Sequence, residues 1–480
     1  MNERLIVNFP GKPEACQECF EILSPILPHA LQQLSLDSTF TIHENANKCC
    51  KHFNDSVLKN FKPTRESLFP IVTYDEALST IEKYCFPLGL EFVSIVDNFP
   101  ILKNFILFED IYNQSPFPPF PASTRDGYAV ISEDGLGKRI VLQSLDAGQV
   151  INTVVTSGKC IKISTGACVP KGANAVLQIE DTKLLSSTNG SENEIEVLFL
   201  VKPGENIRPI GSDLEVGKIL KRDDKLNAVS IALLSSIGLQ KVPVYKKPIV
   251  GVMSTGDEIV EVGKQLPNKH CIYDSNRPLL KCLLTQDGFQ FHDFGIATDI
   301  KNVLIEKFCE AFRICDVVVT SGGVSMGHKD FVKEILKQNF NAEIHFGRVD
   351  MKPGKPITMA TLTFNGQTKF FFGLPGNPVS VFVCYNVLIK KSLKILSGDK
   401  NYKPQLVKKT LRLQSSLFLD SRQEFLRVNV QGNECFSTDS NQCSSRLYNT
   451  VNANGLAFLP KSSPTRKQIH NGYEVDVLIL

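Results

Sequence analysis

The sequence has no excess of either charge. Its 480 residues include 53 basic and 50 acidic side chains, which nearly cancel. Proteins that bind nucleic acid or membrane surfaces usually carry a strong net charge or a long basic cluster. The balance therefore argues against both classes, although a local basic cluster can still select a small anion.

A long apolar run is also missing. No segment approaches the roughly 20 apolar residues that a membrane-spanning helix needs. The N-terminal residues 1–4 lead into only a short apolar stretch. We therefore expect a soluble, cytoplasmic protein without a secretion signal or a transmembrane segment.

Cysteine is present, but not in the spacing of a structural zinc site. The 14 cysteines are scattered, and the close pairs are Cys16/Cys19 and Cys49/Cys50. A second Cys-x-x-Cys motif, which would complete a four-ligand zinc site, is absent from the sequence. Metal ligation stays an alternative, but reduced structural thiols fit this spacing better.

The apolar pattern divides the chain into several domains, as its length requires. Strands alternate with helices over 246–396, which predicts a parallel α/β sheet. The remaining segments are predicted to be the end of a domain (1–34), a polar linker (35–64), a discontinuous helical and extended segment (65–110 and 215–245), an inserted β-rich module (111–214) and a C-terminal β-rich domain (397–480). Within the third of these, Thr73 and Glu76 predict a capping box at the start of a helix.

The segment 320–330 predicts an anion site beyond a buried strand. It follows the apolar run 316–319, and ligands of open α/β sheets bind at the carboxyl ends of strands. Asp330 follows, and a carboxylate beside an anion suggests an intervening cation such as Mg²⁺. A Gly-rich turn with a helix-capping Asp is the alternative. The candidate hydroxyl and backbone N–H donors are Ser321, Gly322, Gly323, Ser325 and Gly327.

Two further loops carry basic or hydroxyl groups. Lys352 and Lys355 flank a Pro-Gly bend, and two ammonium groups held close are easiest to understand if a polyanion neutralises both. A solvated basic turn is the alternative. The run 370–380 predicts a buried strand, a Gly/Pro loop and a helix start whose N–H groups and Ser380 could bind a second anion.

Other polar clusters are individually weak, because Gly and Asp dominate ordinary turns. They contain Asp126 in an Arg-Asp-Gly corner, Thr165 in a Thr-Gly-Ala turn, and Asp213 at the end of a Gly-bounded loop.

Taken together, the loops are far more specific than any one of them. The motifs Ser-x-x-Asp-Gly-Tyr-Ala at 123–129, Ser-Thr-Gly-Asp-Glu at 254–258, Thr-Ser-Gly-Gly-Val-Ser-Met-Gly-x-x-Asp at 320–330, Lys-Pro-Gly-Lys-Pro at 352–356 and Leu-Pro-Gly-Asn-Pro-Val-Ser at 374–380 resemble those of the molybdenum insertases. This family comprises the bacterial MoeA proteins and the E domain of gephyrin. The resemblance covers about 65–480. It implies a MogA-like parallel α/β domain, an inserted small β module, a helical and extended segment, and a C-terminal β-barrel.

The resemblance implies a Mg²⁺-dependent molybdopterin molybdenumtransferase, which inserts molybdate into adenylated molybdopterin and releases AMP. Asp299 and Asp330 would hold Mg²⁺ and the phosphates of the adenylate. Further implied acidic residues and ligand contacts are Asp126, Thr165, Asp213 and Glu258. The implied molybdate pocket consists of Lys352, Lys355, Ser380, Arg427 and one of Ser444 or Ser445.

The family also implies partners. A homodimer is expected, with the Asp126 loop of one subunit serving the site of the other. Residues 1–34 resemble the end of the gephyrin G domain, so a separate molybdopterin adenylyltransferase is the expected pathway partner.

The alternative function is a gephyrin-like dimeric scaffold that clusters membrane receptors, with or without catalysis. Gephyrin does so through an aromatic residue on the first helix and a Tyr in the last domain. Leu78 takes the first position here and 460–468 contains no Tyr, which argues against receptor binding. A generic nucleotide-phosphate-binding α/β enzyme is a third possibility.

Overall fold

A computed structural model describes residues 69–98, 102–324 and 331–480. The chain contacts define two units, of which Leu68–Leu480 is the second and contains all of these residues. The predictions for 1–34 and 35–64, and those for Ser325, Gly327 and Asp330, lie outside the described residues.

Helix α5 (Tyr74–Tyr84) begins at the predicted capping box. The Thr73 hydroxyl accepts a hydrogen bond from the Glu76 N–H at 3.2 Å, and the Glu76 carboxylate accepts one from the Thr73 N–H at 2.7 Å. Two orphan donors of the first turn are thereby satisfied. The prediction for this helix start is confirmed.

A small independent core follows α5 in the chain. It is built mainly of apolar residues from two antiparallel strand pairs and a helix that begins at an Asn227 cap. The elements are β1 (Leu90–Ser94), β2 (Ile111–Asn113), β11 (Gly217–Leu220), α7 (Ala228–Ser236) and β12 (Lys241–Tyr245).

The segment between β2 and β11 folds into a β-rich module, as the short alternating runs predict. The polar stretch 184–194 is a hairpin whose turn is only Asn189–Gly190, both with positive φ. Its sheet has the order β7, β4, β6, β5, β9, β8, with bounds Ala175–Gln178, Gly127–Val130, Lys159–Ile163, Gly137–Leu145, Ser191–Val197 and Thr182–Thr188. The short strands β3 (Ala122–Ser123) and β10 (Ile207–Arg208) pair beside it.

The predicted parallel α/β domain is confirmed. Its sheet has the order β16, β13, β17, β21, β20, β18, and the first four strands are mutually parallel. Strand β20 runs antiparallel because an Asn365–Gly366 turn joins it directly to β21. The bounds are Phe291–Ala297, Val250–Thr255, Val317–Ser321, Gln367–Leu374, Thr358–Phe364 and Glu343–Phe346.

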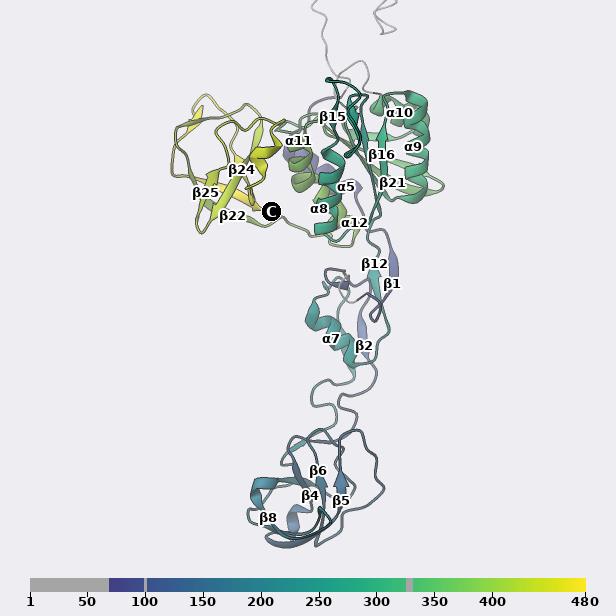
Figure 1. Cartoon of the computed structure of the whole chain (residues 1–480), viewed down its shortest axis with the longest axis vertical. Helices are drawn as coiled ribbons and strands as arrows, with labels where there is room; N and C mark the ends of the chain where they lie inside the picture. The colour runs from purple at the N-terminus through teal and green to yellow at the C-terminus, as the bar shows by residue number, and fades with distance from the viewer. Residues whose placement is uncertain (1–68, 99–101, 325–330) are drawn as a thin grey trace, which may run out of the picture. The chain divides into compact units, whose positions relative to one another are not determined.

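Helices cover both faces of this sheet. Figure 1 shows α9 and α10 on one face and α8 and α11 on the other. The helix whose start was predicted at the end of the run 370–380 consists of α11, a π-helical turn at 385–389, and α12. The bounds are α8 Asn276–Gln286, α9 Lys301–Ile314, α10 Val332–Phe340, α11 Pro378–Cys384 and α12 Lys390–Leu396.

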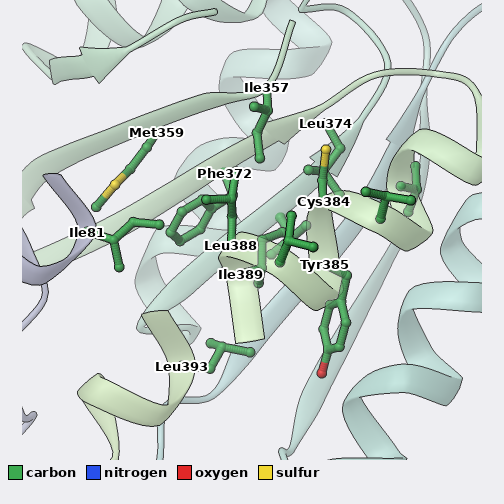
Figure 2. Close-up of a cluster of buried hydrophobic side chains, with 14 of the residues drawn as sticks. Ile81, Ile357, Met359, Phe372, Leu374, Cys384, Tyr385, Leu388, Ile389 and Leu393 are labelled. Atoms are coloured by element: carbon green, nitrogen blue, oxygen red, sulfur yellow. The ribbon is translucent and has the colours of Figure 1, made fainter. Parts of the chain in front are cut away.

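Strand alternation separates the two cores of this domain. Val317 and Val319 face the core beneath α8 and α11, whereas Val318 faces the core beneath α9 and α10. Figure 2 shows Phe372 packed near Leu388 in the first core. Burial of β17 on both faces is typical of a parallel strand and fixes the position of the loop that follows it.

The C-terminal domain is a closed five-stranded barrel. Strands β24, β25, β22, β28 and β26 form a ring because β26 also pairs with β24, and the short strand β19 adds to β24 from outside. The bounds are β19 Met351–Lys352, β22 Leu406–Arg412, β24 Gln423–Gln431, β25 Glu434–Ser437, β26 Gly455–Leu459 and β28 Tyr473–Ile479. In the described part of the chain, no helix is long and apolar enough to cross a membrane.

Candidate active site

The Gly-rich loop begins where β17 ends. Gly322 and Gly323 have φ values of +90° and +67°, which L side chains rarely adopt. A Cβ on Gly322 would lie 2.4 Å from the Thr255 carbonyl oxygen, so these glycines allow the loop to approach the end of β13. The Gly322 N–H donates to the Leu374 carbonyl at 2.9 Å. This N–H group is therefore already hydrogen-bonded within the sheet, and other groups of the loop must bind an anion.

Acidic residues gather at the same edge of the sheet. Asp299 follows β16, and its N–H donates to the Asp257 carboxylate at 3.0 Å. Glu258 follows β13 and is exposed to solvent. Asp257 was not among the predicted residues, although it stands next to Glu258 in the Ser-Thr-Gly-Asp-Glu motif. Asp299, Asp257 and Glu258 thus bring carboxylate oxygens to the edge that carries the Gly-rich loop.

Asn276, the first residue of α8, was also missed. Its side-chain N–H₂ donates to the Ser321 hydroxyl at 2.6 Å and to the Gly376 carbonyl at 2.7 Å. It therefore joins the loop after β17 to the loop after β21. The sequence signal that could have indicated Asn276 is its place as a polar residue on the buried side of a helix start.

The two lysines of the Pro-Gly bend have different surroundings. The Lys352 ammonium lies 3.2 Å from an Asp420 carboxylate oxygen and 3.1 Å from one of Glu424. The Arg422 guanidinium, helped by Lys352, holds the pKa of Asp420 well below its usual range. Lys352 thus has two carboxylate partners within the protein, in addition to any anion that it shares with Lys355. No acidic side chain of the described ranges forms an ion pair with Lys355.

Arg427 is a buried cation without a carboxylate partner among the described residues. It lies on β24, is 1% exposed, and donates from Nη2 to the Cys443 carbonyl at 3.3 Å. Its Nε–H is buried and has no acceptor in the described part of the chain. Burial lowers the pKa of Arg427 to about 10, so the guanidinium stays charged at neutral pH. A buried, unpaired charge is costly and calls for an anion.

The barrel loop after β25, which contains Ser444, contacts the start of α11. The Ser444 carbonyl accepts the Val379 N–H at 3.1 Å, and the Ser444 hydroxyl accepts from the Asn377 amide at 3.0 Å. One first-turn N–H that was predicted to be free is therefore occupied. Ser380 is buried in the same turn, whereas the Ser445 hydroxyl contacts the Cys443 thiol at 3.2 Å.

The contacts Arg427–Cys443 and Ser444–Val379 bring three predicted residues to one junction. Arg427 and Ser444 come from the barrel, and Ser380 comes from α11. The lysine bend touches the same helix, since the Cys384 thiol lies 3.9 Å from the Gly354 carbonyl oxygen.

The candidates of the β-rich module form two groups. The Asp126 carboxylate accepts the Thr165 N–H at 2.7 Å, so these two predicted residues lie together on exposed turns. Asp213 forms an ion pair with Arg208. Within the described ranges, no hydrogen bond or ion pair links Asp213 to Asp126. Likewise, the described residues contain no cluster of three or more His, Cys, Asp or Glu side chains suited to a metal ion.

Three family models match the chain in order. They are the MoeA N-terminal region, domains I and II, over 72–238, a probable molybdopterin-binding domain over 251–395, and the MoeA C-terminal region, domain IV, over 410–480. The α/β sheet, the loops at its edge and the barrel are thus those of a molybdopterin-binding protein of the MoeA type.

The chain belongs to the molybdopterin molybdenumtransferase family. It is 35% identical to a molybdopterin molybdenumtransferase of Haemophilus influenzae, over 75% of this chain and 88% of that protein. It is also 35% identical to the molybdenum cofactor synthesis protein cinnamon of Drosophila melanogaster, over 96% of this chain and 75% of that protein. Gephyrin of Dictyostelium discoideum is 31% identical with the same coverage.

A solved structure supports the same assignment. The molybdopterin biosynthesis MoeA protein of Pyrococcus horikoshii is 29% identical, with a TM-score of 0.70. The match covers 85% of this chain and 99% of that one. The fold predicted from the resemblance is therefore confirmed.

A glycine substitution tests the close approach of the loop. We expect Gly322→Ala to lower the free energy of unfolding by about 1 kcal/mol for the left-handed backbone and by a further ~1–3 kcal/mol for the clash with Thr255. Gly366→Ala is the matched control, because φ there is +75° but the space is open. Thermal and denaturant unfolding of both variants would show equal losses if the contact with Thr255 did not matter.

Proposed function

We propose that this protein inserts molybdate into adenylated molybdopterin and releases AMP in the last step of molybdenum cofactor synthesis. The family assignment supports this reaction, since relatives of this chain carry the name molybdopterin molybdenumtransferase. The observation that carries the proposal is the buried, unpaired Arg427. Its guanidinium bonds the Cys443 carbonyl, and the next residue, Ser444, bonds the first turn of α11, which holds Ser380. A planar guanidinium with hydroxyls around it suits a small tetrahedral oxyanion.

Molybdate is proposed to bind at the junction between the barrel and α11. Arg427 and Lys355 supply positive charge that no carboxylate of the described chain neutralises. Ser380 and either Ser444 or Ser445 supply hydroxyl groups. Lys352 has a different role in this proposal, because its ammonium already forms ion pairs with Asp420 and Glu424. These ion pairs hold β24 against the lysine bend.

The adenylate is proposed to bind at the carboxyl edge of the α/β sheet. The loop from Ser321 to Gly323 would face its phosphates. Asp299 would hold a Mg²⁺ ion there together with Asp330, and Glu258 would be a further acidic residue of the site. Carboxylate oxygens suit Mg²⁺, and Asp299 and Glu258 follow β16 and β13 at the same edge of the sheet as the phosphate loop after β17. When bound, the ion would polarise the phosphoanhydride and favour cleavage to AMP. The role proposed for Asp330 follows from the resemblance alone.

A homodimer completes the proposal. The Asp126–Thr165 pair lies on exposed turns of the β-rich module, and Asp213 lies on another. In the proposed dimer these residues serve the site of the second subunit, while a separate adenylyltransferase supplies the substrate in the cytoplasm. Receptor scaffolding is less well supported, because Leu78 is not aromatic and packs partly against the α/β core.

Replacing Arg427 tests the proposed molybdate pocket. We expect Arg427→Met to lower kcat/KM for molybdate about a hundredfold, measured as molybdate-dependent AMP release from adenylated molybdopterin with Mg²⁺. Stability without molybdate should be equal or higher, because an unpaired buried charge is removed. Arg412→Met is the control, since Arg412 pairs with Glu434 on the exposed barrel surface. If the wild-type protein released no additional AMP when molybdate is added, the enzymatic function would be disproved.

The two lysines should respond differently to substitution. Lys355→Ala is expected to raise the KM for molybdate about tenfold, with an unchanged melting temperature. Lys352→Ala is expected to lower the free energy of unfolding by about 1–2 kcal/mol, because Asp420 and Glu424 lose their partner while Lys352 is partly in water. Enzyme kinetics and thermal unfolding of both variants separate the two roles. Identical behaviour of the variants would contradict the division.

Sedimentation velocity tests the proposed dimer. We expect a dimer at micromolar concentration. Mixing the two impaired variants Asp126→Ala and Arg427→Met should restore part of the AMP release, because a mixed dimer contains one intact site. A monomer alone at that concentration, or no restored activity from a proven mixed dimer, would show that the site is not shared.

A further inference from the structure

Asn276 occupies an unusual position at the start of α8. The residue is 8% exposed, and one amide group reaches two separate loops. It donates at 2.6 Å to the Ser321 hydroxyl at the end of β17, and at 2.7 Å to the Gly376 carbonyl after β21. The Asp274 carboxylate accepts the Asn276 backbone N–H at 3.0 Å, which holds the helix start in place.

The side chain is only half satisfied. The Oδ1 atom of Asn276 is buried and has no hydrogen-bond donor among the described residues. Leaving a buried acceptor unpaired is unfavourable, so such a group needs an explanation other than stability. Asn386 offers the contrast: it is equally buried, but its amide donates to the Phe382 carbonyl within its own helical run at 2.9 Å.

The two loops joined by Asn276 lead to different parts of the proposed site. Ser321 continues into Gly322 and Gly323, the proposed contact for the phosphates of the adenylate. Gly376 leads into α11, whose first turn carries Ser380 at the proposed molybdate pocket. A reaction between two bound groups depends on their mutual placement, and small displacements are costly.

We propose that Asn276 is a positioning residue that holds the adenylate loop and the molybdate loop in register. The inference rests on the proposed function and deepens it. It assigns to one buried amide the coupling of two ligand subsites. Removal of the Asn276 amide should therefore weaken the binding of both ligands, although the amide contacts neither ligand.

Ligand binding by calorimetry tests this coupling. The probes are AMP with Mg²⁺, and molybdate, each titrated separately into the full chain. Asn276→Ala loses both donated bonds, so we expect both affinities to fall about fivefold or more. Ser321→Ala loses only the bond on the Gly-rich loop, so we expect only AMP binding to weaken. Asn386→Ala is the matched control, with lower thermal stability but affinities within about twofold of wild type.

The outcomes are distinct. If the wild-type chain binds both probes and Asn276→Ala binds them equally well, the inference is overturned. A wild-type chain that binds neither probe overturns the proposed function itself. If Asn276→Ala does not fold, hydrogen exchange of the wild-type chain replaces it. Addition of AMP with Mg²⁺ should slow amide exchange over 374–377, and unchanged exchange there overturns the coupling.

Discussion

The alternation of side chains along β24 determines where the positive charge of this site lies. Phe425 points outward into the core shared with the α/β domain, whereas Leu426 points into the barrel. Arg427 follows on the outward side, so the strand period places a guanidinium in the junction rather than in water. That junction must provide acceptors for it. The protein supplies the Cys443 carbonyl and leaves Nε–H unpaired, which is the arrangement expected of a binding site.

Near the same junction, Lys352 and Lys355 look equivalent in the sequence but have different ion-pair partners in the structure. Lys352 lies in register with Glu424 of β24, and its ammonium forms an ion pair with the Glu424 carboxylate that holds the barrel strand. Lys355, three residues later, has no such partner in the described chain. Lysines three residues apart on one Pro-Gly bend thus differ in their ion pairs within the described chain. Net charge alone does not reveal this difference.

Local rules predicted much of the fold, and long-range pairing explains most of what they missed. The Thr73 capping box and the buried strand at 317–321 follow from short patterns, and the loops of the site follow from motifs. The partners of Lys352 lie in the barrel, and the acceptor of Arg427 lies in a later loop of its own barrel, so no local pattern could place them. The antiparallel β20 had a usable signal in Asn365–Gly366, which is a typical hairpin turn. Asn276 was missed because its two acceptors meet only in the folded sheet.

Helix α11 has a consequence for how the domains depend on each other. Its N-cap residue, Asn377, makes no capping bond within the helix, and Ser444 of the barrel accepts both the Asn377 amide and the Val379 N–H. The helix is therefore capped by another domain. An α/β domain expressed without the barrel would begin α11 with an open donor, and a barrel without the α/β domain would expose Phe425. Order at the start of α11 and docking of the two domains therefore depend on the same contacts.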